Sequence, residues 1–195
     1  MTENLVIKIV IHGRGGQGAV TACELIAEAA YLSGNYMDVH AYPSFGAERR
    51  GAPVQAFAKL SKREKIWDRA QIENPDVLII FDETVLTQQI VSSLKPDGIF
   101  IVNSQNNPEF FKVNYNLSES NKVIVADISK LSLEKNLTID GNPVINTPIL
   151  GLLAKALPDI SLENLHKALM RRMSEKIAAL NYELIKEGND LAKIL

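Results

Sequence analysis

Leu5-Val-Ile-Lys-Ile-Val-Ile11, followed at once by His12-Gly-Arg-Gly-Gly-Gln-Gly18, decides the fold of this chain. The first stretch is apolar and rich in β-branched residues, which is typical of a strand covered on both faces of a parallel sheet. The second stretch is a glycine-rich turn, and it leads into residues 19–32, whose small and apolar side chains recur at helical spacing. A strand, a glycine turn and a helix in this order predict a Rossmann-like α/β domain.

Further strands follow at intervals along the chain. The pattern predicts them at residues 37–42, 54–60, 76–82, 99–102 and 123–126. Residues 54–60 alternate apolar and polar side chains, which indicates a half-exposed strand and is compatible with an antiparallel direction. We therefore expect a three-layer α/β domain over residues 1–195, with a mostly parallel sheet, helices on both faces and antiparallel strand additions.

Helix signals lie between and after these strands. A helix is expected over residues 83–94, and another begins at Thr147-Pro148, with Thr147 as the N-cap. Ser161 precedes a longer helix that Gly188 is expected to end. Its apolar residues recur every three or four positions, as in a stripe that packs on the core or contacts another subunit. The stripe consists of Leu162, Leu165, Leu169, Met173, Ile177, Leu180 and Leu184.

The glycines of the turn have the spacing of a dinucleotide fingerprint, Gly13-x-Gly15-x-x-Gly18. Glycines let the backbone come close to a ligand, and the unpaired amides at a helix start attract phosphate or carboxylate. NAD sites also use an acidic residue at the end of the second strand, but this chain has His40-Ala41-Tyr42 there. Binding of another anion, and a turn needed only for close packing, remain as alternatives to NAD binding.

Composition narrows the functional classes. The chain has 195 residues, 46% of them hydrophobic, and a formal net charge of -2, so nothing indicates a nucleic-acid partner or an anionic membrane surface. The single cysteine, Cys23, falls within the first helix and is expected to be a core residue. One thiol cannot hold an iron–sulfur cluster, which needs about four thiolates. No secretory signal or spanning apolar run is apparent, so we expect a cytoplasmic protein.

Conventional catalytic sets are missing from the sequence. His12, His40 and His166 have no metal-ligand spacing, and neither a nucleophile elbow nor a Walker lysine occurs. Asp82, Asn103 and Asp127 follow strands, where polar side chains line a ligand crevice or cap the next helix. We assign no catalytic residue and no metal ligand.

A second unusual segment is Tyr42-Pro-Ser-Phe-Gly-Ala-Glu-Arg-Arg-Gly51, which follows the end of a strand. Arg49 and Arg50 could hold a phosphate or carboxylate through forked hydrogen bonds, with Glu48 orienting one of them. A solvated loop with local ion pairs fits the same residues.

Together, the two segments resemble the signature segments of the gamma subunit of pyruvate/ketoisovalerate (2-oxoacid):ferredoxin oxidoreductases. The resemblance implies CoA-dependent oxidative decarboxylation of pyruvate to acetyl-CoA and CO2, with electrons passing to ferredoxin, and the reverse reaction. It implies alpha, beta and delta partner subunits. Thiamine diphosphate and Mg would belong to alpha and beta, and [4Fe-4S] clusters to beta and delta, so this chain alone is expected to hold no cofactor and to be inactive.

The resemblance places a ligand-binding or interface face on the two segments. The candidate residues are Gly13, Arg14, Gly15, Gly16, Gln17, Gly18, Tyr42, Pro43, Ser44, Gly46, Glu48, Arg49 and Gly51. Coenzyme A carries phosphates that such a face would suit. Enzymes for 2-oxoisovalerate, indolepyruvate or 2-oxoglutarate are rival assignments, and so is a free-standing nucleotide-binding module.

Overall fold

The computed structural model describes residues 6–44 and 50–195, and over these ranges it has a seven-stranded sheet in the order β2-β3-β1-β4-β5-β6-β9. Strands β2, β1, β4, β5 and β6 run parallel, whereas β3 is antiparallel to both of its neighbours and β9 is antiparallel to β6. The expected mostly parallel sheet with antiparallel additions is confirmed. The strands are β1 (Val6–Arg14), β2 (Asp38–Pro43), β3 (Pro53–Ser61), β4 (Val77–Ile80), β5 (Ile99–Asn103), β6 (Lys122–Ala126) and β9 (Lys193–Ile194).

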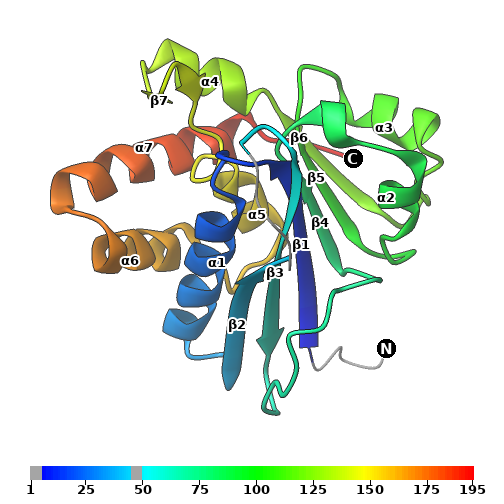
Figure 1. Cartoon of the computed structure of the whole chain (residues 1–195), viewed down its shortest axis with the longest axis horizontal. Coiled ribbons are helices and arrows are strands. Elements are labelled where there is room, and N and C mark those ends of the chain that lie inside the picture. Colours follow the sequence, from blue (N-terminus) through cyan, green and yellow to red (C-terminus); the bar gives the residue numbers. More distant parts are fainter. Residues whose placement is uncertain (1–5, 45–49) are drawn as a thin grey trace.

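Helices cover both faces of the sheet, as Figure 1 shows. One face packs against α1 (Ala19–Ser33), α4 (Ile128–Glu134), α5 (Leu150–Ala156), α6 (Leu162–Arg172) and α7 (Glu175–Leu191). The other face packs against the 3-10 helix η1 (Glu83–Val85), α2 (Gln88–Ser92) and α3 (Pro108–Asn114). A small hairpin of β7 (Thr138–Ile139) and β8 (Asn142–Pro143) stands apart from the sheet, beside α4.

The two cores follow from the alternation of side chains along each strand. In β4, Val77 and Ile79 enter the core under α1, whereas Leu78 and Ile80 enter the core under α2 and α3. Because both faces are covered, the central parallel strands β4, β5 and β6 are mostly apolar, which is why they could be recognised in the sequence. Cys23 is fully buried under the first face, as expected, and burial raises the pKa of its thiol.

The expected half-exposed strand is buried instead. The polar side of β3 is covered by the chain between β3 and β4, which is held by hydrogen bonds from the Tyr42 hydroxyl to the Ala70 carbonyl and from the Ile66 amide to Asp38. Lys59 is only 6% exposed and donates to Asp68 at 2.5 Å. Alternation therefore predicted the strand correctly but not its burial, because a polar residue with a partner can lie inside.

Two expected helices are interrupted. The region 83–94 is divided into η1 and α2, because Thr87 is extended and its hydroxyl accepts from the Ile90 amide as a new N-cap. The long C-terminal helix is likewise two helices, α6 and α7, separated by extended Met173 and Ser174. Of its stripe, Leu165, Leu169 and Leu184 are buried in the core, whereas Ile177 and Leu180 are about half exposed.

Gly188 and the Thr147-Pro148 start also differ from expectation. Gly188 lies inside α7, where a Cβ atom would collide with the Pro148 carbonyl oxygen, so it allows close packing and does not end the helix. Helix α5 begins only at Leu150, after a tight turn. Buried Thr147 donates its hydroxyl hydrogen to Asn181 at 2.5 Å and so joins this turn to α7, which is why it is not an N-cap.

Candidate functional site

The glycine turn joins β1 to α1 at the carboxyl end of β1. Gly16 and Gly18 have φ values of 94° and 77°, which side chains rarely adopt, and Gly18 is the N-cap of α1. No side chain among residues 6–44 and 50–195 caps this helix start. The amides of its first turn therefore point into the space above the turn without a helical partner.

Gln17 folds back over its own turn. Its Oε1 accepts from the Arg14 amide at 2.7 Å, and its Nε2 donates to Asp82 Oδ2 at 3.3 Å. A Cβ atom on Gly13 would lie 2.9 Å from this Oε1 and 3.2 Å from Phe81 Cβ, so the position needs glycine to make room for the contact. The Gln17 side chain is thus used to shape the turn.

The chain after position 49 pairs with the glycine turn. The Gly15 amide donates to the Ala52 carbonyl at 2.8 Å, and the Gly51 amide donates to the Gly15 carbonyl at 3.0 Å. These bonds bring the two unusual sequence segments together at the same edge of the sheet. Only the tertiary structure could reveal this pairing, because the segments are separated by α1 and β2.

Arg14 joins both segments to the end of β4. Its Nη1 donates to the Gly51 carbonyl at 2.9 Å, and its Nε and Nη2 donate to Thr84 Oγ1 at 3.0 and 2.6 Å. Its Nε also lies 3.2 Å from Asp82 Oδ2. The guanidinium is therefore engaged by protein groups, so Arg14 fixes the site and does not offer an unpaired charge to a ligand.

Asp82 is the partner of this network. Its Oδ1 accepts from the Thr84 amide at 2.9 Å and from the Thr84 hydroxyl at 2.5 Å. Burial raises the pKa of Asp82, but the Thr84 hydrogen bonds, Arg14 and Gln17 outweigh it, and the pKa lies below its ordinary value. Asp82 is thus an ionised structural acceptor that also caps η1.

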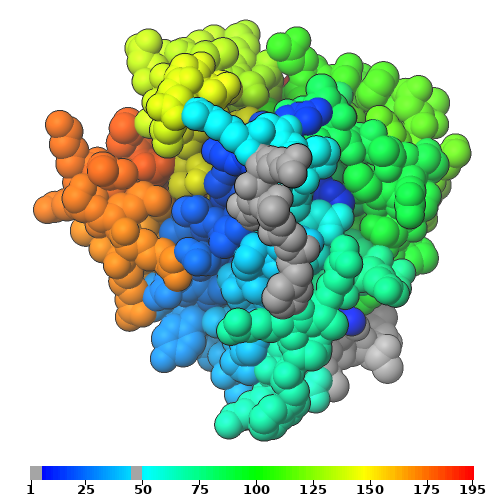
Figure 2. All heavy atoms as spheres, viewed as in Figure 1, coloured from blue at the N-terminus to red at the C-terminus, as the bar shows by residue number. Residues whose placement is uncertain are grey.

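A cleft of about 930 Å³ lies over the glycine turn, and we call it the glycine-turn cleft. Its far wall is the β7–β8 hairpin and the following chain through Asn146. Arg50 reaches this wall and pairs with Asp140 at 2.8 Å. In Figure 2 the cyan chain just after position 49 lies against the yellow segment that carries the hairpin. Beneath it, Asn146 lies so close to Gly18 that a Cβ atom on this glycine would collide with its side-chain amide.

The charges of the cleft are balanced among the residues that line it. Arg14 pairs with Asp82, and Arg50 pairs with Asp140. Among the described residues, the recognition groups without a hydrogen-bond partner are mainly backbone amides at the start of α1, together with the Thr21 hydroxyl. Such a cleft suits the polar part of a ligand or a partner backbone more than it suits a bare, highly charged anion.

The candidate residues of the second segment that the structure describes, apart from Gly51, lie away from the cleft. Tyr42 is buried on the opposite face, tilted against Phe57 with 5.4 Å between ring centroids. Pro43 ends β2 and is exposed, and the Ser44 amide donates to the Gln55 carbonyl at 3.0 Å. These three do not line the glycine-turn cleft. The remaining candidates, Gly46, Glu48 and Arg49, lie outside the described residues.

Several cleft residues had no sequence signal as a site. Asp140, Asn142 and Asn146 line the cleft from a part of the chain far from the glycine turn, and Thr84 holds Arg14 at the end of β4. Asp140-Gly141, which lies between β7 and β8, is a residue pair typical of hairpin turns and was the sequence signal for this hairpin. Asp82, Asn103 and Asp127 were expected to line the crevice or cap, and all three accept from the amides of a following helix.

Within the described ranges, no group of three or more His, Cys, Asp or Glu side chains could hold a metal ion. No helix found there is both long enough and apolar enough to cross a bilayer.

His12 gives the fold a dependence on pH. It is 6% exposed on β1, and burial lowers its pKa from 6.5 to about 4. Below pH 6.5 the unfolded chain takes up a proton that the folded chain does not, so stability is lost as pH falls from 6.5 toward 4. We expect His12 to account for about 2 kcal/mol of unfolding free energy lost between about pH 7 and pH 5.

Urea unfolding of the wild type and His12→Gln at both pH values measures this difference. The variant should lose correspondingly less stability on acidification, whereas His166→Gln, at a half-buried histidine stacked on Tyr182, should behave as the wild type does. An equal loss in the wild type and His12→Gln would assign the pH dependence to other groups.

Comparisons with known proteins agree with this architecture. The model of the pyruvate ferredoxin/flavodoxin oxidoreductase family matches residues 8–191. The chain is 42% identical over 163 residues to pyruvate synthase subunit PorC of Methanosarcina barkeri, covering 83% of this chain and 84% of the relative. It is 37% identical over 191 residues to the pyruvate/ketoisovalerate oxidoreductases common subunit gamma of Pyrococcus furiosus, covering 97% and 98%.

A solved structure extends the similarity to three dimensions. The crystal structure of pyruvate oxidoreductase subunit PORC from Thermotoga maritima superposes with a TM-score of 0.81 at 33% identity, covering 98% of this chain and 99% of that chain. The family match spans nearly the whole sequence, and the relatives align along most of both lengths. This chain therefore belongs to the pyruvate ferredoxin/flavodoxin oxidoreductase family, as one of its gamma-type subunits.

Proposed function

We propose that this chain is the gamma subunit of a cytoplasmic pyruvate:ferredoxin oxidoreductase with alpha, beta and delta partners. The reaction converts pyruvate, coenzyme A and two oxidised ferredoxins into acetyl-CoA, CO2, two reduced ferredoxins and a proton. The observation that carries the proposal is the pairing of the two signature segments, Gly15 with Gly51 and Ala52, at one edge of the sheet. The relatives' names supply the substrate and the reaction.

The chain's own groups leave the redox chemistry to other subunits. Cys23 is its one thiol, and it is fully buried in the core, so it does not offer a ligand to a cluster. In the proposed complex, thiamine diphosphate and Mg belong to alpha and beta, and [4Fe-4S] clusters to beta and delta. The thiamine cofactor would stabilise the carbanion left by decarboxylation, and the clusters would carry its electrons to ferredoxin.

We propose that the glycine-turn cleft contributes by contact and positioning. The backbone amides at the start of α1 would donate to a coenzyme A phosphate or to partner backbone, while the Arg14 network keeps the turn and residues 50–52 in place. The charged side chains of the cleft are paired with one another, so none of them is reserved for an anion. A partner surface is therefore proposed on an equal footing with coenzyme A. Gly46, Glu48 and Arg49 stay in this proposal as candidates for the same face.

A second substrate is also supported. The Pyrococcus furiosus relative is named as a subunit common to pyruvate and ketoisovalerate oxidoreductases. If this chain is similarly shared, it would assemble with more than one set of catalytic subunits. The oxoacid would then be selected by those subunits and not by this one.

Purification from the native organism through a tag on this chain tests the proposal. We expect thiamine-binding and cluster-binding subunits to copurify, and the preparation to reduce ferredoxin only when both pyruvate and coenzyme A are present. The separated chain should be inactive. Recovery of the chain as a lone monomer that binds NAD or ATP would instead support a free-standing nucleotide-binding module. Activity with 2-oxoisovalerate in a second purified complex would establish the shared role.

A further inference from the structure

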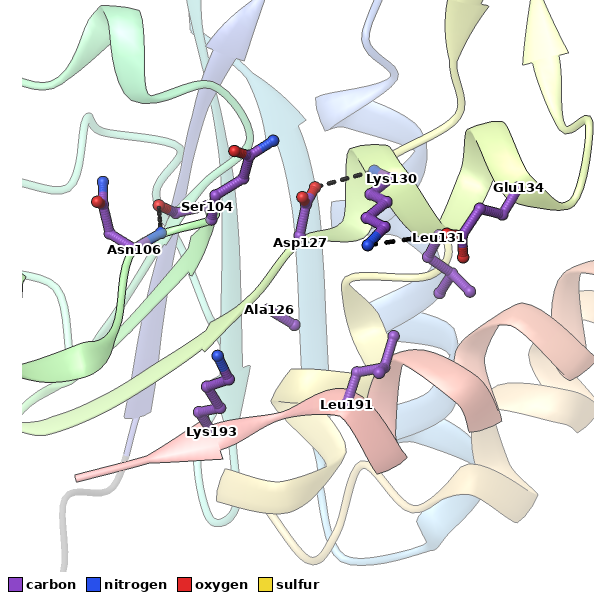
Figure 3. Close-up of a pocket in the computed structure, with 10 residues that line it drawn as sticks. Ser104, Asn106, Ala126, Asp127, Lys130, Leu131, Glu134, Leu191 and Lys193 are labelled. Carbon is purple, nitrogen blue, oxygen red and sulfur yellow. Dashed lines mark hydrogen bonds and ion pairs between the residues drawn. The ribbon is translucent and has the colours of Figure 1, made fainter.

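A second hollow, of about 440 Å³, lies at the carboxyl ends of β5 and β6, and we call it the edge hollow (Figure 3). It is separate from the glycine-turn cleft and shares no lining residue with it. Leu131 of α4 and Leu191 at the end of α7 point toward one another on one side. Lys193 extends from β9 on another side, toward the loop that carries Ser104.

The topology of the sheet produces this hollow. The chain leaving β5 passes to α3, whose Phe111 packs on the second face, whereas the chain leaving β6 passes to α4, whose Leu131 packs on the first. Adjacent parallel strands whose connections leave to opposite faces open a crevice at their carboxyl ends, where α/β proteins bind ligands. Asn103 holds the base of the crevice by accepting from the Ile128 amide at 2.9 Å and donating to the Phe81 carbonyl at 2.9 Å.

Two lysines and a glutamine amide supply the hollow with underused donors. The side chain of Lys193 is exposed and has no hydrogen bond or ion pair with any described residue, although its backbone pairs with β6. Lys130 has only a 3.9 Å contact with Glu134 on the next turn of α4, a spacing and exposure at which ion pairs contribute little. The side chain of Gln105 also lines the hollow. A ligand with acceptor oxygens would therefore gain hydrogen bonds without breaking strong ones.

The opposing charges define what kind of anion fits. Asp127 and Glu134 line the same hollow. Their two negative charges balance the two positive charges of Lys130 and Lys193, so these side chains together have a formal net charge of zero. A doubly charged phosphate would approach two carboxylates as well as two ammonium groups. A singly charged carboxylate between Lys130 and Lys193 meets less repulsion, and an apolar body attached to it would be buried against Leu131 and Leu191.

We propose that the edge hollow is a binding site for a small monocarboxylate with a short apolar body. Its volume falls within the range of about 300–1,000 Å³ that is usual for small-molecule sites. The site does not require the glycine-turn cleft or any partner subunit. It stands independently of the proposed role in the oxidoreductase complex.

Titration of the full, isotope-labelled chain with isobutyrate, acetate and inorganic phosphate, followed by amide NMR shifts, tests the site. Isobutyrate should give saturable shifts at residues 104–106, 126–131 and 191–193, with acetate binding more weakly because it lacks the apolar body, and phosphate weaker still. Lys193→Met should weaken isobutyrate binding about tenfold, as the loss of a charge-assisted hydrogen bond predicts.

Lys176→Met is the matched control, because Lys176 is exposed on α7 outside the hollow. It should leave the affinity unchanged, and spectra of both variants would show whether they remain folded. Absence of saturable shifts with isobutyrate would overturn the site. Phosphate binding as tight as isobutyrate binding, or equal affinity in wild type and Lys193→Met, would overturn the assignment of a monocarboxylate held by Lys193.

Discussion

Replacing Gly151 with alanine is expected to lower the free energy of unfolding by about 3 kcal/mol and the melting temperature by about 6–12 °C. A Cβ atom at this position would collide with the Ile185 carbonyl oxygen and lie 2.5 Å from the Asn189 amide nitrogen. Both are backbone atoms of α7, so no side chain can rotate away to make room. The two helices would have to separate, and the core between them would lose contacts.

The same crossing depends on a second glycine. Gly188 faces the Pro148 carbonyl from the side of α7, and Asn189 donates its side-chain amide to the Gly151 carbonyl at 2.8 Å. Separation of the helices by a methyl group would therefore also weaken a buried hydrogen bond.

Thermal unfolding followed by circular dichroism measures this effect. Gly34→Ala is the control, because Gly34 has a φ of 74° but no atom of the described part of the chain lies within 4 Å of the added Cβ, so only a left-handed backbone cost of about 1 kcal/mol applies. If Gly151→Ala melts at the same temperature as Gly34→Ala, the close approach of α5 and α7 is not a constraint on the fold.

Replacing Arg14 with methionine is expected to lower the kcat/KM of the assembled oxidoreductase about tenfold or more, because small displacements at a positioning site can have large effects on rate. Methionine keeps the unbranched apolar stem of the side chain but removes the bonds to the Gly51 carbonyl and to Thr84. It also leaves Asp82, with 22% side-chain exposure, without its cation. The glycine turn and residues 50–52 would lose their link to the end of β4. We expect a stability loss of about 1–3 kcal/mol.

Arg50→Met is the matched comparison from the same cleft. Arg50 also pairs with a carboxylate, but its side chain is 73% exposed and that of Asp140 is 66% exposed. Such pairs contribute about 0–1 kcal/mol, so this variant should keep wild-type stability. Steady-state assays of both complexes, with urea unfolding of both free chains, provide the readouts. Equal behaviour of the two variants would show that the Arg14 network has no special role in holding the site.

The sequence predicted the strands best, and physical reasons explain why. Strands such as β4 are buried on both faces, so Val77 to Ile80 form an uninterrupted apolar run that is visible without the structure. The helix boundaries were less well predicted. Thr87 and Ser174 are N-caps of new helices, although the apolar residues around them keep helical spacing. An extended N-cap residue interrupts a helix without changing the periodicity of its apolar side chains, so the sequence pattern did not show the break.

The site could be predicted only in part. Its glycine turn was evident because Gly16 and Gly18 need positive φ and follow a strand. The roles of Arg14 and Gln17 were not evident, because their partners Thr84 and Asp82 lie about 70 residues away and polar side chains have no periodic signal. Tyr42 was grouped with the site by its place in the motif, although alternation along β2 directs it to the opposite face.

The short strand β9 has a consequence for handling the protein. It borders β6, whose Val123, Ile124 and Val125 are fully buried, and Leu195 exchanges two backbone hydrogen bonds with Val123. Without residues 193–195, the outer rim of β6 would present unpaired amides and carbonyls to any other molecule able to add a strand. Trimming at this end would thus invite intermolecular sheet growth and precipitation, even though all of the helices remained intact.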